Sequence, residues 1–284
     1  MTRVPGNLSI VVLALAAACD GAPTVSADGA PQDVNAAVDG ASAADTTPAA
    51  DAWSPPLECR GDPLPVGEGT AVRGHAFAFG PGGGRVVGGF VTAEELPGRC
   101  ARTERDGAFA LQGFAPGGTA TLRLHHPSHA PIQTGTLTVP PDGLQRVTFQ
   151  APDHSTYRVL ELVLRLDADP ARCQIASTVT RVGLSLYDRT DHGEAGATVT
   201  IDPPVAAPAE GPVYFEYLNE QAIIPDRRLR MTTRDGGVLF LNVPAGDYTL
   251  TAHKEGVRFT TARIRCRPGL LVNASPPWGL QALP

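Results

Sequence analysis

The chain contains one sequence pattern twice. A segment from Thr103 to Gly117 recurs from Thr232 to Gly246, at a constant offset of 129 residues. The identical pairs at this offset are Thr103 and Thr232, Arg105 and Arg234, Asp106 and Asp235, Gly107 and Gly236, and Gly117 and Gly246. Upstream, residues 88–92 match residues 196–200 at an offset of 108, so the second copy carries an insertion of 21 residues. A repeat of this length constrains the fold, because both copies must form the same supersecondary unit.

Each copy has the pattern of paired β-strands. Asp106-Gly107 and Asp235-Gly236 supply the positive φ values of a two-residue hairpin turn, and apolar residues two apart follow each of them. Proline and glycine then precede a second alternating run, which marks another turn into a strand. The chain has 31 Gly and 27 Pro, a content that disfavours long helices. The sequence therefore predicts turn-rich antiparallel β-sandwiches.

This pattern resembles the carboxypeptidase regulatory-like domain. The shared elements are a glycine before an alternating strand, the T-x-x-D-G turn with apolar residues after it, and a closing strand that contains Tyr248 in the second copy but Thr119 in the first. The resemblance covers about residues 70–150 and 178–270, and it implies a transthyretin-like, seven-stranded sandwich in each. It also implies a non-catalytic accessory or binding module, because the peptidase chemistry of the namesake enzymes lies in another domain.

We therefore expect an all-β protein with two tandem transthyretin- or immunoglobulin-like antiparallel β-sandwich domains. The expected division is a signal peptide over 1–18, a lipidated cysteine and disordered acidic tether over 19–57, a first sandwich over 58–150, a connecting segment over 151–174 and a second sandwich over 175–284. Apolar residues at helical spacing, Tyr157, Leu160, Val163 and Leu164, favour a short helix between the sandwiches that docks one against the other. Leucines that alternate from Leu160 to Leu166 leave a strand as the alternative.

The first residues have the layout of an export signal. Arg3 is followed by an apolar run over 8–15, which is too short for a permanent membrane span, and then by three alanines before Cys19. The stretch over 15–19 resembles a bacterial lipobox, in which Cys19 becomes the lipidated N-terminus. The alternative is an ordinary signal peptide cleaved near Ala18. We expect an exported protein that is lipid-anchored to a bacterial membrane, in the periplasm or at the cell surface.

The acidity of the chain lies mainly in the segment that follows. Residues 20–57 contain six Asp and no Lys or Arg, whereas the whole chain has a formal net charge of −6. The remainder is therefore close to neutral. A segment of this composition cannot bury a core, so we expect an extended spacer. The charge also disfavours nucleic acid as a partner, because phosphate binding needs clustered Lys and Arg.

The four cysteines beyond Cys19 predict two disulfides in an exported protein. Cys59 and Cys100 bracket the early part of the first copy, and Cys173 and Cys266 bracket most of the second. Pairing within each copy, Cys59–Cys100 and Cys173–Cys266, is expected to stabilise each by roughly 3 to 5 kcal/mol. A metal site would need closely spaced pairs such as C-x2-C, which the sequence lacks.

No motif in the sequence predicts catalysis or a cofactor. His125, His126 and His129 are close in sequence, but they follow a strand and two prolines interrupt the segment, so we expect no metal site there. The chain has no nucleophile elbow, H-E-x-x-H helix or dinucleotide fingerprint. We therefore expect a non-enzymatic protein with no cofactor.

Two functions remain open. The first is a binding or scaffolding lipoprotein of the cell envelope, with envelope proteins or glycans as partners. The second is carbohydrate binding, because related sandwiches resemble starch-binding modules that stack sugars on exposed aromatic rings. Tyr214 and Tyr217 in the insertion of the second copy are the expected ligand contacts, and an extra edge strand is the alternative role of that insertion.

Overall fold

The computed structural model describes residues 55–59, 69–80, 83–188, 191–219 and 222–284. The predicted signal peptide, Cys19 and nearly all of the predicted tether lie outside these residues. The last residue of that tether, Leu57, begins a short 3-10 helix, η1 (Leu57–Cys59). Within the described ranges, no helix is long and apolar enough to cross a membrane.

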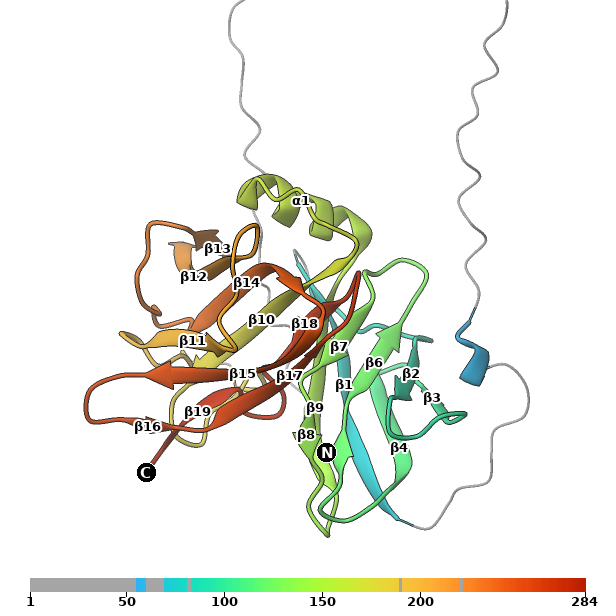
Figure 1. Ribbon diagram of the computed structural model, residues 1–284. Helices are drawn as coiled ribbons and strands as arrows, with labels where there is room; N and C mark the ends of the chain where they lie inside the picture. Colours follow the sequence, from blue (N-terminus) through green and yellow to red (C-terminus); the bar gives the residue numbers. More distant parts are fainter. Residues whose placement is uncertain (1–54, 60–68, 81–82, 189–190, 220–221) are drawn as a thin grey trace, which may run out of the picture. The chain divides into compact units, whose positions relative to one another are not determined.

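The described residues are mainly β-strand (Figure 1). The strands before the single α-helix are β1 (Thr70–Phe79), β2 (Phe90–Ala93), β3 (Cys100–Arg102), β4 (Ala108–Phe114), β5 (Thr119–Ala120), β6 (Leu122–His125), β7 (Ile132–Thr134), β8 (Leu137–Thr138) and β9 (Leu144–Pro152). After α1 (His154–Leu164) come β10 (Arg172–Thr180), β11 (Thr198–Asp202), β12 (Glu210–Asn219), β13 (Ala222–Asp226), β14 (Gly237–Pro244), β15 (Gly246–His253), β16 (Arg258–Phe259), β17 (Thr261–Cys266), β18 (Leu271–Asn273) and β19 (Leu280–Leu283).

Both repeats have the same strand pairing. In the first, β1 lies between β4 and β9, and β6 lies between β2 and β7. In the second, β10 lies between β14 and the pair β18 and β19, and β15 lies between β11 and β17. The expectation of purely antiparallel sheets is wrong, because β1–β9, β10–β18 and β10–β19 are parallel pairs. The last strand of each repeat thus returns beside its first strand.

Matching hydrogen bonds connect the same pair of positions in both repeats. The N–H of Gly89 donates to Oγ1 of Thr103 (2.8 Å), and the N–H of Ala197 donates to Oγ1 of Thr232 (2.9 Å). The N–H of each threonine donates back to the carbonyl of the same partner, at 2.8 Å in both repeats. The sequence offsets of 108 and 129 therefore connect structurally equivalent positions.

The two Asp-Gly turns also match, but they are not two-residue hairpins. Asp106 accepts the N–H of Ala108 and Asp235 accepts that of Gly237, both at 2.9 Å. Only the glycines have positive φ, 77° at Gly107 and 79° at Gly236, whereas a two-residue type I′ turn needs it at both positions. The flanking strands then separate: β3 pairs with β2 and β4 with β1, while β13 and β14 both pair with β12.

Each repeat has its own sandwich core between two layers of strands. In the first repeat, Val72 of β1 and Phe149 of β9 pack with Leu122 and Leu124 of β6. In the second, side chains of β10 and β14, such as Ile175 and Phe240, pack with those of β15 and β17. This arrangement follows from the alternation of apolar residues along the strands, which places one face of each sheet inward.

A single sheet passes from one repeat into the other. The edge strand β18 of the second repeat pairs in parallel with the edge strand β7 of the first, with Leu271 beside Ile132 and Asn273 beside Thr134. Neighbouring strands along the sheet are β13-β12-β14-β10-β18-β7-β6-β2-β3 (Figure 1). The insertion of the second repeat supplies β12 and β13 at one edge of this sheet.

The segment between the repeats forms α1. The side chain of Asp153 caps its N-terminus by accepting the N–H of Thr156 (2.7 Å), and Arg165 ends it in the left-handed conformation at φ 47°. The helix occupies 11 residues of the predicted connecting segment 151–174. Val163 differs from the expectation, because its side chain is 46% exposed rather than packed inward.

The structure contains both predicted disulfides. Cys59–Cys100 connects η1 to β3, and Cys173–Cys266 connects β10 to β17 across the core of the second sandwich. Cys173 and Cys266 are completely buried. The second disulfide therefore joins the two layers of its sandwich directly.

A test of the β1–β9 pairing comes from Gly74. A Cβ at this position would lie 1.6 Å from the carbonyl oxygen of Val147 on β9, so the two backbones would have to separate. We expect Gly74→Ala to lower the free energy of unfolding by at least about 3 kcal/mol, measured by chemical denaturation. Arg73→Ala, at an exposed position of the same strand, is the control and should change stability by less than about 0.5 kcal/mol. Equal effects of the two substitutions would contradict the close approach of β1 and β9.

Candidate functional site

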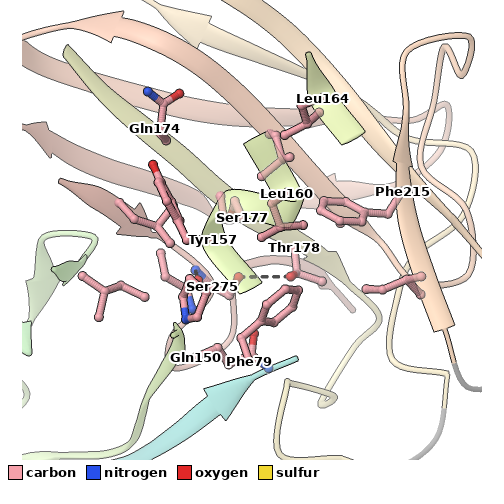
Figure 2. Close-up of a pocket in the computed structure, with 18 of the residues that line it drawn as sticks. Phe79, Gln150, Tyr157, Leu160, Leu164, Gln174, Ser177, Thr178, Phe215 and Ser275 are labelled. Atoms are coloured by element: carbon pink, nitrogen blue, oxygen red, sulfur yellow. Dashed lines mark hydrogen bonds between the residues drawn. The ribbon is translucent and has the colours of Figure 1, made fainter. Parts of the chain in front are cut away.

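A cavity of about 120 Å³ lies between α1 and the sheet beneath it (Figure 2). Tyr157, Leu160 and Leu164 reach it from the helix, and Phe215 from β12. The first repeat also contributes, through residues of β1, β7 and β9 that include Phe79 and Gln150. The lining is mainly apolar and combines both repeats with the helix that connects them.

Small side chains on β10 leave space for part of this cavity. Leu164 packs with large residues of β12 and β14, including Phe215 and Leu241, in a small apolar cluster under the helix. On the neighbouring strand β10, the lining residues are Gln174 and the smaller Ala176, Ser177 and Thr178, and Oγ1 of Thr178 lies 3.0 Å from Oγ of Ser275 (Figure 2). Because large side chains hold one end of α1 away from the sheet, the helix cannot also contact the small side chains beside them.

One part of the lining is polar and titratable. His192 and Asp235 both contact the cavity, and their exposed fractions are only 9% and 8%. Burial raises the pKa of Asp235, while the nearby His192 and the N–H of Gly237 partly oppose that shift. By contrast, the pKa of the equivalent Asp106 is lowered, chiefly by the N–H of Ala108. The same turn residue therefore sits in water in one repeat and in an enclosed site in the other.

The predicted ligand contacts in the insertion behave differently from each other. Tyr214 is only 1% exposed, lies in the core of the second sandwich and accepts the N–H of Val199 (3.0 Å) on its hydroxyl. Tyr214 is therefore not available for stacking a sugar, because alternation on β12 turns it inward. Tyr217 is half-buried, and the guanidinium of Arg234 lies 4.3 Å from the centre of its ring. The segment is an added strand near the sheet edge, as the alternative prediction stated.

The histidines separate into two groups. His125 lies on β6 within 3.4 Å of Thr92, whereas the Nδ1 atoms of His126 and His129 lie 3.0 Å apart. Burial and the neighbouring His126 lower the pKa of His129 to about 4. His154 at the start of α1 donates to the carbonyl of Pro127 (3.2 Å). Among the residues that the structure describes, no group of three or more His, Cys, Asp or Glu has metal-binding geometry.

Sequence patterns did not identify the cavity. The sequence predicts only a turn at Asp235. It predicts no site residue at Ala176, Thr178, His192 or Ser275. One signal was available, since the outward-facing positions of β10 carry small or polar residues while its inward-facing positions carry Ile175 and Val179. Nothing in the sequence shows that α1 would cover that outward face.

Comparisons with known proteins give no family assignment. No protein-family model matches the chain, and no curated protein matches it. Several solved structures are similar to the chain. Three of them, each at low TM-score, are the Bacillus anthracis TIE protein (TM-score 0.23, 12% identity, 72% of this chain and 33% of that chain), the minor pilin GBS52 of Streptococcus agalactiae (0.22, 10%, 76% and 97%) and a streptococcal ancillary pilin (0.21, 13%, 73% and 63%). The chain thus spans about a third of the TIE protein. What the structure itself establishes is a mainly β protein with several sheets, a repeated strand pairing and a mainly apolar cavity.

The opposite environments of Asp235 and Asp106 predict opposite pH effects. Because the folded-state pKa of Asp235 is raised, its stabilising contribution is complete below the unfolded pKa and is lost as the pH rises through the folded pKa. We expect Asp235→Asn, which can still accept the N–H of Gly237, to raise the melting temperature at pH 7 and to leave it unchanged near pH 3. The melting temperatures of variant and wild type should be compared across this range.

Asp106→Asn is the matched control. Its lowered pKa gives a contribution that is present above the unfolded pKa and lost as the pH falls, so this variant should be no more stable than wild type at pH 7. If Asp235→Asn were instead less stable than wild type at pH 7 and equal to it at pH 3, the buried carboxylate would be stabilising. That result would contradict the stated direction of its pKa.

Proposed function

We propose that this protein is a non-catalytic lipoprotein of the cell envelope that acts as a rigid binding or scaffolding module. In this proposal, residues 1–18 direct export, Cys19 carries the lipid and residues 20–57 form a spacer. Residues 58–150 and 175–284 form two tandem carboxypeptidase regulatory-like β-sandwiches. Two disulfides support exposure to an oxidising compartment. The repeated strand pairing supports the assignment of two equivalent sandwiches.

The observation that carries the scaffolding role is the backbone pairing between repeats. Besides the β7–β18 pair, the N–H of Thr136 donates to the carbonyl of Arg263 (2.8 Å), and the buried side chain of Gln133 donates to the carbonyl of Arg265 (2.6 Å). Hydrogen bonds of this kind fix both the distance and the register of the units. A flexible tandem array would leave these edge groups to water.

Charged side chains reinforce the same junction. Arg265 of β17 contacts Glu94 and Glu95, both at 3.1 Å, and Arg267 lies 3.6 Å from Glu94. Glu94 also pairs with Arg123 of its own repeat. These side chains are between 18% and 37% exposed, so the network is only partly screened by solvent.

A second group of contacts, made by Arg146, also joins the two repeats. Arg146 of β9 donates to Ser185 (2.9 Å) and pairs with Asp188 (3.3 Å), both from the second repeat. Its guanidinium lies 5.0 Å from the ring of Tyr187 and 4.8 Å from that of Trp278. Cation–π contacts of this geometry add to the packing. Two separate contacts resist rotation of one repeat on the other better than one.

Carbohydrate binding is the second candidate, and it rests on Tyr217 alone. Its ring is partly exposed, but Arg234 already occupies one face. Saturable binding of the purified protein on a glycan array would favour this function over scaffolding.

Rigid coupling of the repeats predicts cooperative unfolding. We expect the full chain to give one calorimetric transition, and Arg265→Ala to lower its melting temperature by about 2–4 °C, as for a loss near 1 kcal/mol. Arg228→Ala is the control, because its side chain is 90% exposed and pairs within its own turn. Two resolved transitions in the wild-type protein would contradict the scaffolding proposal.

Lipid anchoring predicts covalent labelling at one residue. In bacteria grown with radiolabelled palmitate, the protein should carry label and fractionate with membranes. Cys19→Ala should abolish both, because the lipidated sulfur is removed. Labelling that persists in Cys19→Ala would contradict anchoring at this cysteine.

A further inference from the structure

The cavity beneath α1 adjoins the strand pairing between the repeats but lies apart from their ion-pair network. Its lining includes Ile132 of β7 and Leu271 of β18, which pair with each other, but neither Glu94 nor Arg265. Above β10, β12 and β14 the cavity is covered by α1. Sites at junctions between units are a preferred location for small-molecule binding.

The size and lining of the cavity define what could fill it. A volume of about 120 Å³ is somewhat smaller than an apolar cavity of about 150 Å³ that accepts benzene. Leu160, Leu164 and Phe215 provide apolar walls suited to a single ring. A second fused ring would exceed this volume.

The polar residues of the lining define the chemistry of one substituent. Asp235 accepts the N–H of Gly237 with one oxygen, and a carboxyl group retains further acceptor capacity. His192 lies close enough to influence its charge. Thr178 and Ser275 are hydrogen-bonded to each other. A ligand that carries one hydroxyl donor would therefore find an acceptor in a mainly apolar cavity.

We propose that this cavity binds a monocyclic aromatic alcohol of the size of phenol, with its ring between α1 and β10 and its hydroxyl group directed to Asp235 and His192. The two repeats differ in the exposure of the equivalent aspartate, and the proposed site needs the buried one. The equivalent Asp106 lies in an exposed turn, whereas Asp235 is buried and lines the same cavity as Phe215 of the insertion and Leu160 of α1. The site extends the function beyond scaffolding and does not depend on the lipid anchor.

The experiment titrates the purified full-length protein with phenol, toluene and 2-naphthol, and follows binding by calorimetry and by the shift in melting temperature. We expect saturable binding of phenol, at least tenfold weaker binding of toluene, which lacks the donor, and no binding of 2-naphthol. Absence of phenol binding, or equal binding of phenol and toluene, would overturn the proposed site or its polar end.

Three variants locate the site. Ala176→Leu should fill the cavity and weaken phenol binding at least tenfold. Leu160→Ala should enlarge it and permit 2-naphthol to bind. Leu162→Ala is the matched control on the same helix, since this side chain is 78% exposed and does not line the cavity. If Ala176→Leu does not fold, the gain of 2-naphthol binding by Leu160→Ala but not by Leu162→Ala carries the test.

Two results with these variants would contradict the proposed site. Phenol binding that is unchanged in Ala176→Leu, or 2-naphthol binding that is absent from Leu160→Ala, would place phenol elsewhere on the protein and overturn the proposal. Either outcome leaves the scaffolding function intact, because that function is tested by unfolding cooperativity and by lipid labelling.

Discussion

The pairing of β7 with β18 is the interaction on which the rest of the structure depends. Each sandwich has an open edge, and an unpaired row of N–H and C=O groups is costly if it is buried and prone to association if it is exposed. In this protein the edge strand of each repeat hydrogen-bonds to the edge strand of the other, with Leu271 beside Ile132 and Asn273 beside Thr134. This pairing brings Glu94 and Arg265 together from residues that lie far apart in the sequence.

The same pairing places the first repeat beside the outer face of β10. That face would be exposed in an isolated second sandwich, but α1, the added strands β12 and β13 and residues of the first repeat surround it. Large residues under one part of the helix and small ones under another leave the enclosed cavity. The two repeats are thus equivalent in topology and different in chemistry, because only one of them is covered in this way.

Much of the fold could be predicted from sequence because its signals are local. Alternation of apolar residues, the Asp-Gly turns and the offsets between copies predicted a chain built mainly of β-strands, and the positions of the cysteines predicted their pairing. The predictions that were wrong concern features that depend on residues far away in the sequence. The turn at Asp106 was predicted to be a hairpin, but β3 and β4 join different sheets. Tyr214 was predicted to contact ligand, but its alternation phase turns it into the core.

The sequence by itself determined where strands and turns form, which residues repeat and which cysteines bracket each unit, because these properties depend on neighbours along the chain. Only the tertiary structure decided which edge strands meet and which outer face α1 covers. Those outcomes also decided that Asp235 is enclosed while Asp106 remains in solvent. The physical reason is that burial and the pKa of a carboxyl group depend on atoms brought near by the fold, whereas the hydrogen bond from a backbone N–H to the aspartate side chain is local to each turn and occurs in both.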